Sequence, residues 1–118
     1  RAVLTHRALV HHYASAAMAL DQRASDRVLH ALPLYHSAQM HVFMMPSLML
    51  GSPNWLLDKP APTPVLRAIA AHDIDSFFAA PTVWIALLAL LEKEPERGKK
   101  LKKAYYGASI MPTPVAFL

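Results

Sequence analysis

Histidine is the reactive side chain that this sequence offers in excess, because the chain has seven histidines and no cysteine. A metal site on one helix face would place two imidazoles three or four residues apart. His36 and His41 are instead five residues apart, and His11 and His12 are adjacent. The sequence therefore predicts no metal site, and without cysteine it can form no disulfide or thiolate site.

His36 has the position that best suits a role in chemistry. It follows the strand-like run 28–32 and Pro33, so we expect its side chain at the end of a strand, facing a crevice where it can meet a charged group. A helix-capping or buried structural histidine is the alternative interpretation of this position. Gly107 also ends a strand-like run, as glycine does where the backbone turns sharply or approaches a ligand. An ordinary turn is the alternative there.

Short strand-like runs alternate with longer helical patterns along the chain. Thr5 is expected to cap a helix that runs to Asp21, and Thr63 to cap another that has Pro64 as its first residue. The expected strands are 28–32, 55–57, 76–80 and 104–106, and the expected helices after the first are 37–50, 64–72 and 81–94. This order predicts an α/β fold: a partial parallel sheet with helices on both faces.

In such a sheet, ligands bind at the carboxyl ends of the strands. The residues expected there are 33–36, 80–82 and 107–109, so their convergence predicts a ligand site. The sequence has no G-x-S-x-G elbow and no G-x-x-x-x-G-K-S/T loop, and its three glycines are too scattered to form G-x-G-x-x-G. The absence of these patterns argues against the common hydrolase, P-loop and dehydrogenase sites.

Composition indicates a packed domain or part of one, since 54% of the residues are hydrophobic and 17% are charged. The net charge is +4, and the one basic cluster, at 97–103, follows three glutamates. This is typical of a solvated loop and does not predict nucleic-acid binding. No signal peptide is visible, and the apolar, uncharged stretch 76–91 is too short to span a bilayer. The expected location is the cytoplasm.

Residues 32–39, Leu-Pro-Leu-Tyr-His-Ser-Ala-Gln, resemble the substrate-side motif of the adenylate-forming, AMP-binding superfamily. Residues 3–6 look like the end of that family's phosphate-loop motif, and residues 106–112 are similar to its adenine-side turn. The three segments follow the family's order and cover nearly the whole chain. In detail they most resemble the fatty-acid-CoA ligases, or acyl-CoA synthetases.

The resemblance implies that residues 1–118 are a single fragment of the N-terminal AMP-binding domain, without the mobile C-terminal domain. It also implies a two-step reaction, in which a fatty acid reacts with ATP to give an acyl-adenylate and the acyl group is then transferred to CoA. ATP, CoA and Mg²⁺ are the implied cofactors, although the family's phosphate-loop residues and Mg²⁺ ligands are not in this sequence. The 118-residue chain alone is therefore expected to be inactive.

The resemblance also implies roles for single residues. His36 would be catalytic, beside the acyl carboxylate and the α-phosphate, where it would offset developing charge. The acyl tunnel would be lined by Tyr35, Gln39, Met40 and Trp84, and the nucleotide would be contacted by Thr5, Gly107, Ala108 and Ser109. Three positions depart from the family pattern. Gln39 stands where many members have glycine, Arg1-Ala2 replaces Lys-Gly, and Ser109-Ile110 replaces Ala-Pro.

An aryl or amino-acid adenylating domain of the same superfamily is one alternative, and a non-catalytic remnant or scaffold domain is another. The methionine-rich apolar run after His36 favours an alkyl chain, and an amino-acid site would need a carboxylate that these motifs lack. Peripheral membrane contact is compatible with a long acyl substrate, but no basic amphipathic helix indicates it. The sequence does not indicate an oligomeric state.

Overall fold

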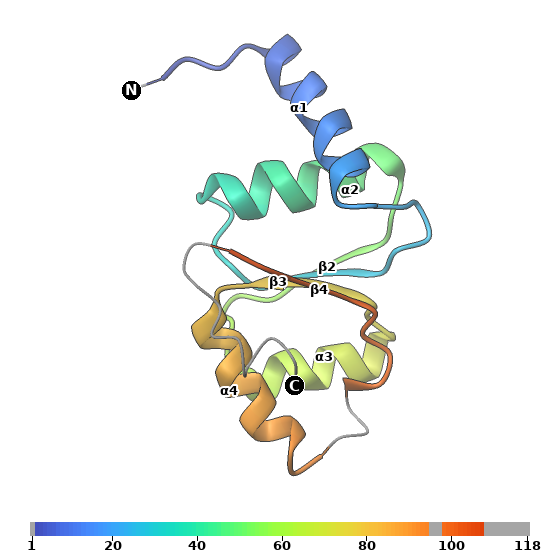
Figure 1. The fold of residues 1–118 in the computed structure, drawn as a ribbon, viewed down its shortest axis with the longest axis vertical. Helices are drawn as coiled ribbons and strands as arrows, with labels where there is room; N and C mark the ends of the chain where they lie inside the picture. The colour runs from blue at the N-terminus through green and yellow to red at the C-terminus, as the bar shows by residue number, and fades with distance from the viewer. Residues whose placement is uncertain (1, 95–97, 108–118) are drawn as a thin grey trace.

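The computed structural model describes residues 2–94 and 98–107. Within them, a four-stranded parallel sheet in the order β2-β1-β3-β4 lies between layers of helices (Figure 1). The strands are β1 (Val28–His30), β2 (Asn54–Leu56), β3 (Ser76–Ala79) and β4 (Lys103–Tyr106). The helices are α1 (His6–Ala19), η1 (Ala38–Met44), α2 (Met45–Leu50), α3 (Pro62–His72) and α4 (Pro81–Leu91). The predicted fold class and the predicted order of elements are confirmed.

Different helices cover the two faces of the sheet. Helices α3 and α4 lie on one face and η1 and α2 on the other, while α1 packs on the outside of η1 and α2 (Figure 1). Helix coverage on both faces is the arrangement that a parallel sheet requires. In the part of the chain that the structure describes, no helix is long and apolar enough to cross a membrane.

Alternate residues of the central strands point to opposite faces of the sheet. Leu29 and Phe77 belong to the apolar cluster shared with α3 and α4. His30 and Phe78 point toward η1, where the Phe78 ring stacks on Phe43 with the ring centroids 4.4 Å apart. The apolar cluster also contains Ala31, Val65, Leu66, Ala68, Ile69, Ile74, Ala79, Trp84 and Leu87. The packing on one face of the sheet is thus mainly apolar, and the other face mixes aromatic and polar contacts.

Helices α1 and α3 begin in different ways, and only the N-cap predicted for α1 is confirmed. Thr5 caps α1 as predicted, because its hydroxyl oxygen accepts a hydrogen bond from the Ala8 N–H at 3.0 Å. The prediction that Thr63 caps α3 is wrong, since the helix starts earlier, at Pro62, with Ala61 as the N-cap and no side-chain cap. Proline at the first position has the helical φ already fixed and needs no partner for an N–H.

The helix predicted over 37–50 is continuous, but its first part, η1, has π-helical turns. Pro46 has no N–H to donate to the Val42 carbonyl, as a regular α-helix would require. The Gln22 side chain donates to that carbonyl instead, at 2.9 Å. Gly51 ends the helix with a φ of 81°, in the left-handed region that suits glycine. The π-helical turns are uncommon and often occur at functional sites.

A chain of hydrogen bonds joins η1, β1 and β2. Asn54 donates its side-chain N–H to the Ser52 carbonyl at 2.7 Å, and its Oδ1 faces Nε2 of His30. Nε2 of His30 therefore carries the imidazole proton, and Nδ1 of His30 is an acceptor. The side-chain amide of Gln39 donates an N–H to this Nδ1 at 2.6 Å. Burial lowers the pKa of His30, although the Asn54 hydrogen bond opposes this effect, so the ring is neutral near pH 7.

A second set of polar contacts fastens the edge strand β4 to the connection between α1 and β1. Nζ of Lys103 lies 3.0 Å from the Asp26 carboxylate and also donates to the Asp21 carbonyl. The Tyr105 hydroxyl donates to the Leu20 carbonyl at 2.7 Å. Burial, together with the carboxylates of Asp26 and Asp21, raises the pKa of Tyr105, so this hydroxyl stays a donor.

The neutral state of His30 predicts that the chain loses stability as the pH falls below 6.5. In the unfolded state His30 binds a proton near its ordinary pKa of 6.5, whereas burial lowers its pKa in the folded state. As the pH decreases below 6.5, the unfolded state therefore takes up a proton that the folded state does not, and the free energy of unfolding decreases. The loss approaches about 1.4 kcal/mol per pH unit. Urea unfolding at about pH 7.5 and about pH 5.5 should show a larger loss for the wild type than for His30→Gln, whose side chain does not titrate. Equal losses would contradict a neutral, buried His30.

Replacing Lys103 by Met should lower the free energy of unfolding by about 2 kcal/mol, because it leaves a largely buried Asp26 carboxylate without its cation. Lys100→Met is the matched control. Lys100 lies 3.8 Å from Asp73, both side chains are more than half exposed, and the expected loss is below about 0.5 kcal/mol. Urea unfolding near neutral pH compares the two variants. If they lose the same amount, the Lys103 contact does not hold β4 in place.

Candidate functional site

A cavity of about 310 Å³ lies where the carboxyl ends of β1 and β3 meet the start of η1. It is lined by Leu32, Pro33, His36, Ser37, Ala38, Gln39, Phe78 and Ala80. Three of them, Pro33, His36 and Ala80, come from two of the strand ends that the sequence predicted to converge. The described structure thus has a hollow, mainly apolar site at the place where parallel sheets bind their ligands.

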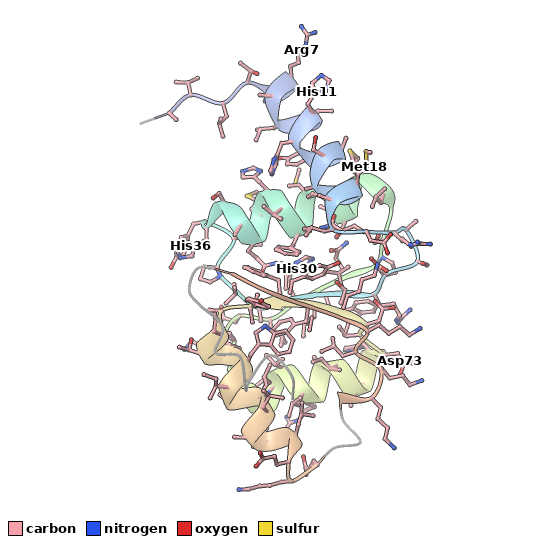
Figure 2. The ribbon with its side chains drawn as sticks, viewed as in Figure 1. Arg7, His11, Met18, His30, His36 and Asp73 are labelled. Atoms are coloured by element: carbon pink, nitrogen blue, oxygen red, sulfur yellow. The ribbon has the colours of Figure 1, made fainter. Side chains whose placement is uncertain are left out.

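His36 stands at the mouth of this cavity. It precedes the first turn of the helix, and its backbone N–H donates to the Pro33 carbonyl at 3.2 Å. Its ring leans on Tyr35, with the centroids 4.7 Å apart. Figure 2 shows His36 at the outer end of η1 and His30 between this helix and the sheet. An exposed imidazole above an apolar hollow can donate a hydrogen bond, or place a positive charge, next to an anionic group of a ligand.

Gln39 and Phe78 form the inner part of the cavity. Gln39 is only 1% exposed and is held by its hydrogen bond to His30. The Phe78 ring stacks on Phe43 and also lies close to Gly107, where an added Cβ would lie 3.3 Å from Phe78 Cε2. A larger residue at position 107 would therefore press on the ring that lines the cavity. Gly107 connects the end of β4 to the site through this contact.

Two further hollows adjoin the cavity. One of about 510 Å³ lies between the ends of β1 and β2 and is lined in part by His30, Tyr35 and Asp58. Tyr35 is 85% exposed there. The other, of about 400 Å³, lies between the start of α1 and η1, and shares Ser37 and Ala38 with the central cavity.

The structure does not bring every predicted residue to the central cavity. Thr5 is engaged in capping α1, next to the hollow between α1 and η1. Met40 is half-buried on η1 and lines none of the three hollows. Trp84 lies on the opposite face of the sheet, where its indole N–H donates to the Tyr105 carbonyl at 2.9 Å and its ring packs edge-on against Phe77. Its large apolar ring is part of the core.

Two of the nucleotide-side predictions, Ala108 and Ser109, lie outside the described residues. Sequence reasoning also missed His30 and Phe78. A histidine inside a short run of buried strand residues was the available signal for His30, because such a side chain must find hydrogen-bond partners. Among residues 2–94 and 98–107, no three His, Cys, Asp or Glu side chains gather closely enough to hold a metal ion.

Comparisons with known proteins identify the family. Residues 1–118 match the family model described as AMP-binding enzyme. A 2-succinylbenzoate–CoA ligase from Bacillus velezensis is 36% identical over 88 residues, which are 72% of this chain and 18% of that protein. The chain therefore spans about a fifth of the length of this curated relative.

Solved structures share the fold. ATP-bound MatB from Rhodopseudomonas palustris superposes with a TM-score of 0.83 at 20% identity, over 95% of this chain and 22% of that one. The N-terminal domain of FACL13 from Mycobacterium tuberculosis superposes with a TM-score of 0.79 at 23% identity, over 91% of this chain and 27% of that one. The chain belongs to the adenylate-forming superfamily of AMP-binding enzymes, and its fold is that of part of the N-terminal domain of acyl-CoA ligase-like members.

Proposed function

We propose that the chain is part of a longer ATP-dependent acid–thiol ligase that activates a fatty acid. In the first step a carboxylate oxygen attacks the α-phosphorus of ATP, an acyl-adenylate forms and pyrophosphate leaves. In the second step the thiol sulfur of CoA attacks the acyl carbonyl carbon and AMP leaves. The mobile C-terminal domain of the family would lie in another part of that protein.

The observation that carries this proposal is the cavity with His36 at its mouth. Its walls are mainly apolar, from Leu32, Pro33, Phe78 and Ala80, and suit an alkyl chain. The acid group of that chain would lie at the mouth, next to the imidazole, which would orient the carboxylate and offset the charge that develops during adenylation. The apolar walls would exclude water from the reactive acyl-adenylate.

The nucleotide would lie on the side of Gly107 and of the segment that contains Thr5. Gly107 contributes backbone rather than side chain, which suits close packing against a flat base. CoA would provide the accepting thiol. Mg²⁺ would neutralise charge on the phosphates of ATP, but the described residues form no cluster that could hold it, so we assign it no ligand in this part of the chain.

An aryl acid is the second candidate substrate. The Phe78 ring in the cavity wall could stack on an aromatic acid, and the relative from Bacillus velezensis is a 2-succinylbenzoate–CoA ligase. An α-amino acid fits less well, because none of the residues that line the cavity is Asp or Glu and its ammonium group would be left unpaired.

The full-length protein that contains these residues should release pyrophosphate from ATP and Mg²⁺ in the presence of straight-chain fatty acids, and should form acyl-CoA when CoA is added. The 118-residue chain should release none, because the phosphate-binding residues of the reaction are not among its motifs. A signal only with aryl acids would contradict the fatty-acid substrate but keep the adenylation. Absence of pyrophosphate release with every acid would contradict the proposed ligase activity.

In the full-length protein, His36→Ala should lower kcat for pyrophosphate release by about 100-fold, because it removes the donor beside the developing charge. His11→Ala is the matched control, since His11 lies on the exposed outer side of α1 (Figure 2), and it should leave kcat within about twofold. Partial recovery in His36→Gln would indicate that hydrogen bonding is part of the effect. A kcat for His36→Ala equal to that of the control would remove His36 from the site.

A further inference from the structure

An aromatic ring forms part of the buried end of the central cavity. Phe78 is the largest of the residues that line the cavity, and it is only 7% exposed, whereas His36 at the mouth is an exposed residue. An acyl chain that enters past His36 would therefore meet the Phe78 ring at the end of its path.

Contacts with η1 and β4 keep this ring in place. It stacks on Phe43, with the ring centroids 4.4 Å apart, and Phe43 in turn leans on Tyr105 at 5.1 Å. Next to β4, a Cβ added at Gly107 would lie 3.3 Å from Cε2 and 3.7 Å from Cζ of Phe78. Side chains in a close-packed interior have little free volume to move into. The ring is therefore a fixed wall rather than a side chain that a ligand can push aside.

The volume of the cavity limits the chain that fits between the mouth and this wall. The cavity measures about 310 Å³, which is near the lower end of the range of roughly 300–1,000 Å³ for ligand pockets. A water molecule occupies about 30 Å³ and a methylene group is of similar size, so the cavity holds roughly ten such groups. This volume suits octanoate or decanoate and is too small for palmitate.

On the basis of the proposed function, we infer that Phe78 sets the length of the acyl chain and that the preferred substrates are medium-chain fatty acids. The acid end lies at His36 and the methyl end lies against the Phe78 ring. Phe78 is then a specificity-determining residue, which touches the substrate far from the reacting atoms and takes no part in the chemistry.

The same strand provides a matched control for this role. Phe77 directly precedes Phe78 and points to the opposite face of the sheet, where it is fully buried and packs edge-on against Trp84. The two phenylalanines share residue type and strand but differ in the face that they occupy. The same substitution at both positions therefore separates an effect on the cavity from a general loss of stability.

The test measures kcat/KM of the full-length protein for straight-chain acids from butanoate to palmitate. The wild type should be most active with octanoate or decanoate, and palmitate should be at least about 10-fold poorer, because methylene groups that do not fit the pocket lose binding energy. Phe78→Leu enlarges the buried end, so the ratio of kcat/KM for octanoate to that for dodecanoate should fall by about 10-fold. Phe77→Leu should lower stability but leave this ratio within about twofold. A ratio between two acids cancels any effect on ATP or CoA.

Two further variants keep the test decisive. Phe78→Met is similar in volume but flexible enough to move aside, so it should shift the ratio in the same direction even if Phe78→Leu does not fold. Val42→Phe narrows the adjoining hollow between α1 and η1 instead. It should leave the ratio unchanged, because the acyl chain does not lie there.

A wild type that prefers palmitate would overturn this inference while the ligase activity stands. So would equal ratios in the Phe78 and Phe77 variants, or a profile that only Val42→Phe alters. Absence of turnover with every straight-chain acid would instead contradict the proposed function, and the inference would fall with it. A shift toward longer acids in the Phe78 variants alone is the result that supports it.

Discussion

The hydrogen-bonded chain from Ser52 through Asn54 and His30 to Gln39 is the interaction on which the site depends. Strand β1 is the second strand of a parallel sheet and is buried on both faces, so a histidine in it must find partners inside the protein. The Asn54 amide provides one and the Gln39 amide the other, and in doing so they join β2, β1 and η1. These contacts hold the start of η1 over the carboxyl ends of the strands. His36 directly precedes this helix, so its position at the cavity depends on the same contacts.

The two faces of the sheet have different roles: one packs the core and the other borders the cavity. The face under α3 and α4 carries the apolar core, in which Phe77 and Trp84 pack edge to face. The face under η1 holds the polar chain and the stacked rings of Phe43 and Phe78, and it opens into the cavity. Because alternate residues of one strand face opposite sides, Phe77 and Phe78 serve the core and the site respectively. The chain belongs to the adenylate-forming superfamily, and the acyl and nucleotide sites proposed above both lie next to the η1 face of the sheet.

Much of this arrangement could be predicted from the sequence, because the alternation of short buried runs and helical patterns fixes the order of strands and helices, and proline and glycine mark their ends. The π-helical turns of η1 could not, since they accompany a contact between Gln22 and the Val42 carbonyl that joins residues far apart in sequence. The side that Trp84 faces was equally hidden, because a large apolar residue on a helix suits a core and a substrate tunnel equally well. His36 could be named as a candidate site residue from its place after a strand and a proline, whereas the contact between Gln39 and the buried His30 emerges only from the fold.

In the function proposed above, the acyl group lies in the cavity between η1 and β3, with its acid end at His36. A crystal structure of the full-length protein with a non-hydrolysable acyl-adenylate analogue tests it most directly. We expect the acyl carbonyl to lie within hydrogen-bond reach of the His36 imidazole and the acyl chain to enter the cavity beside Gln39 and Phe78. An acyl chain bound on the α3 and α4 face, or in the hollow between α1 and η1 with the central cavity empty, would contradict it.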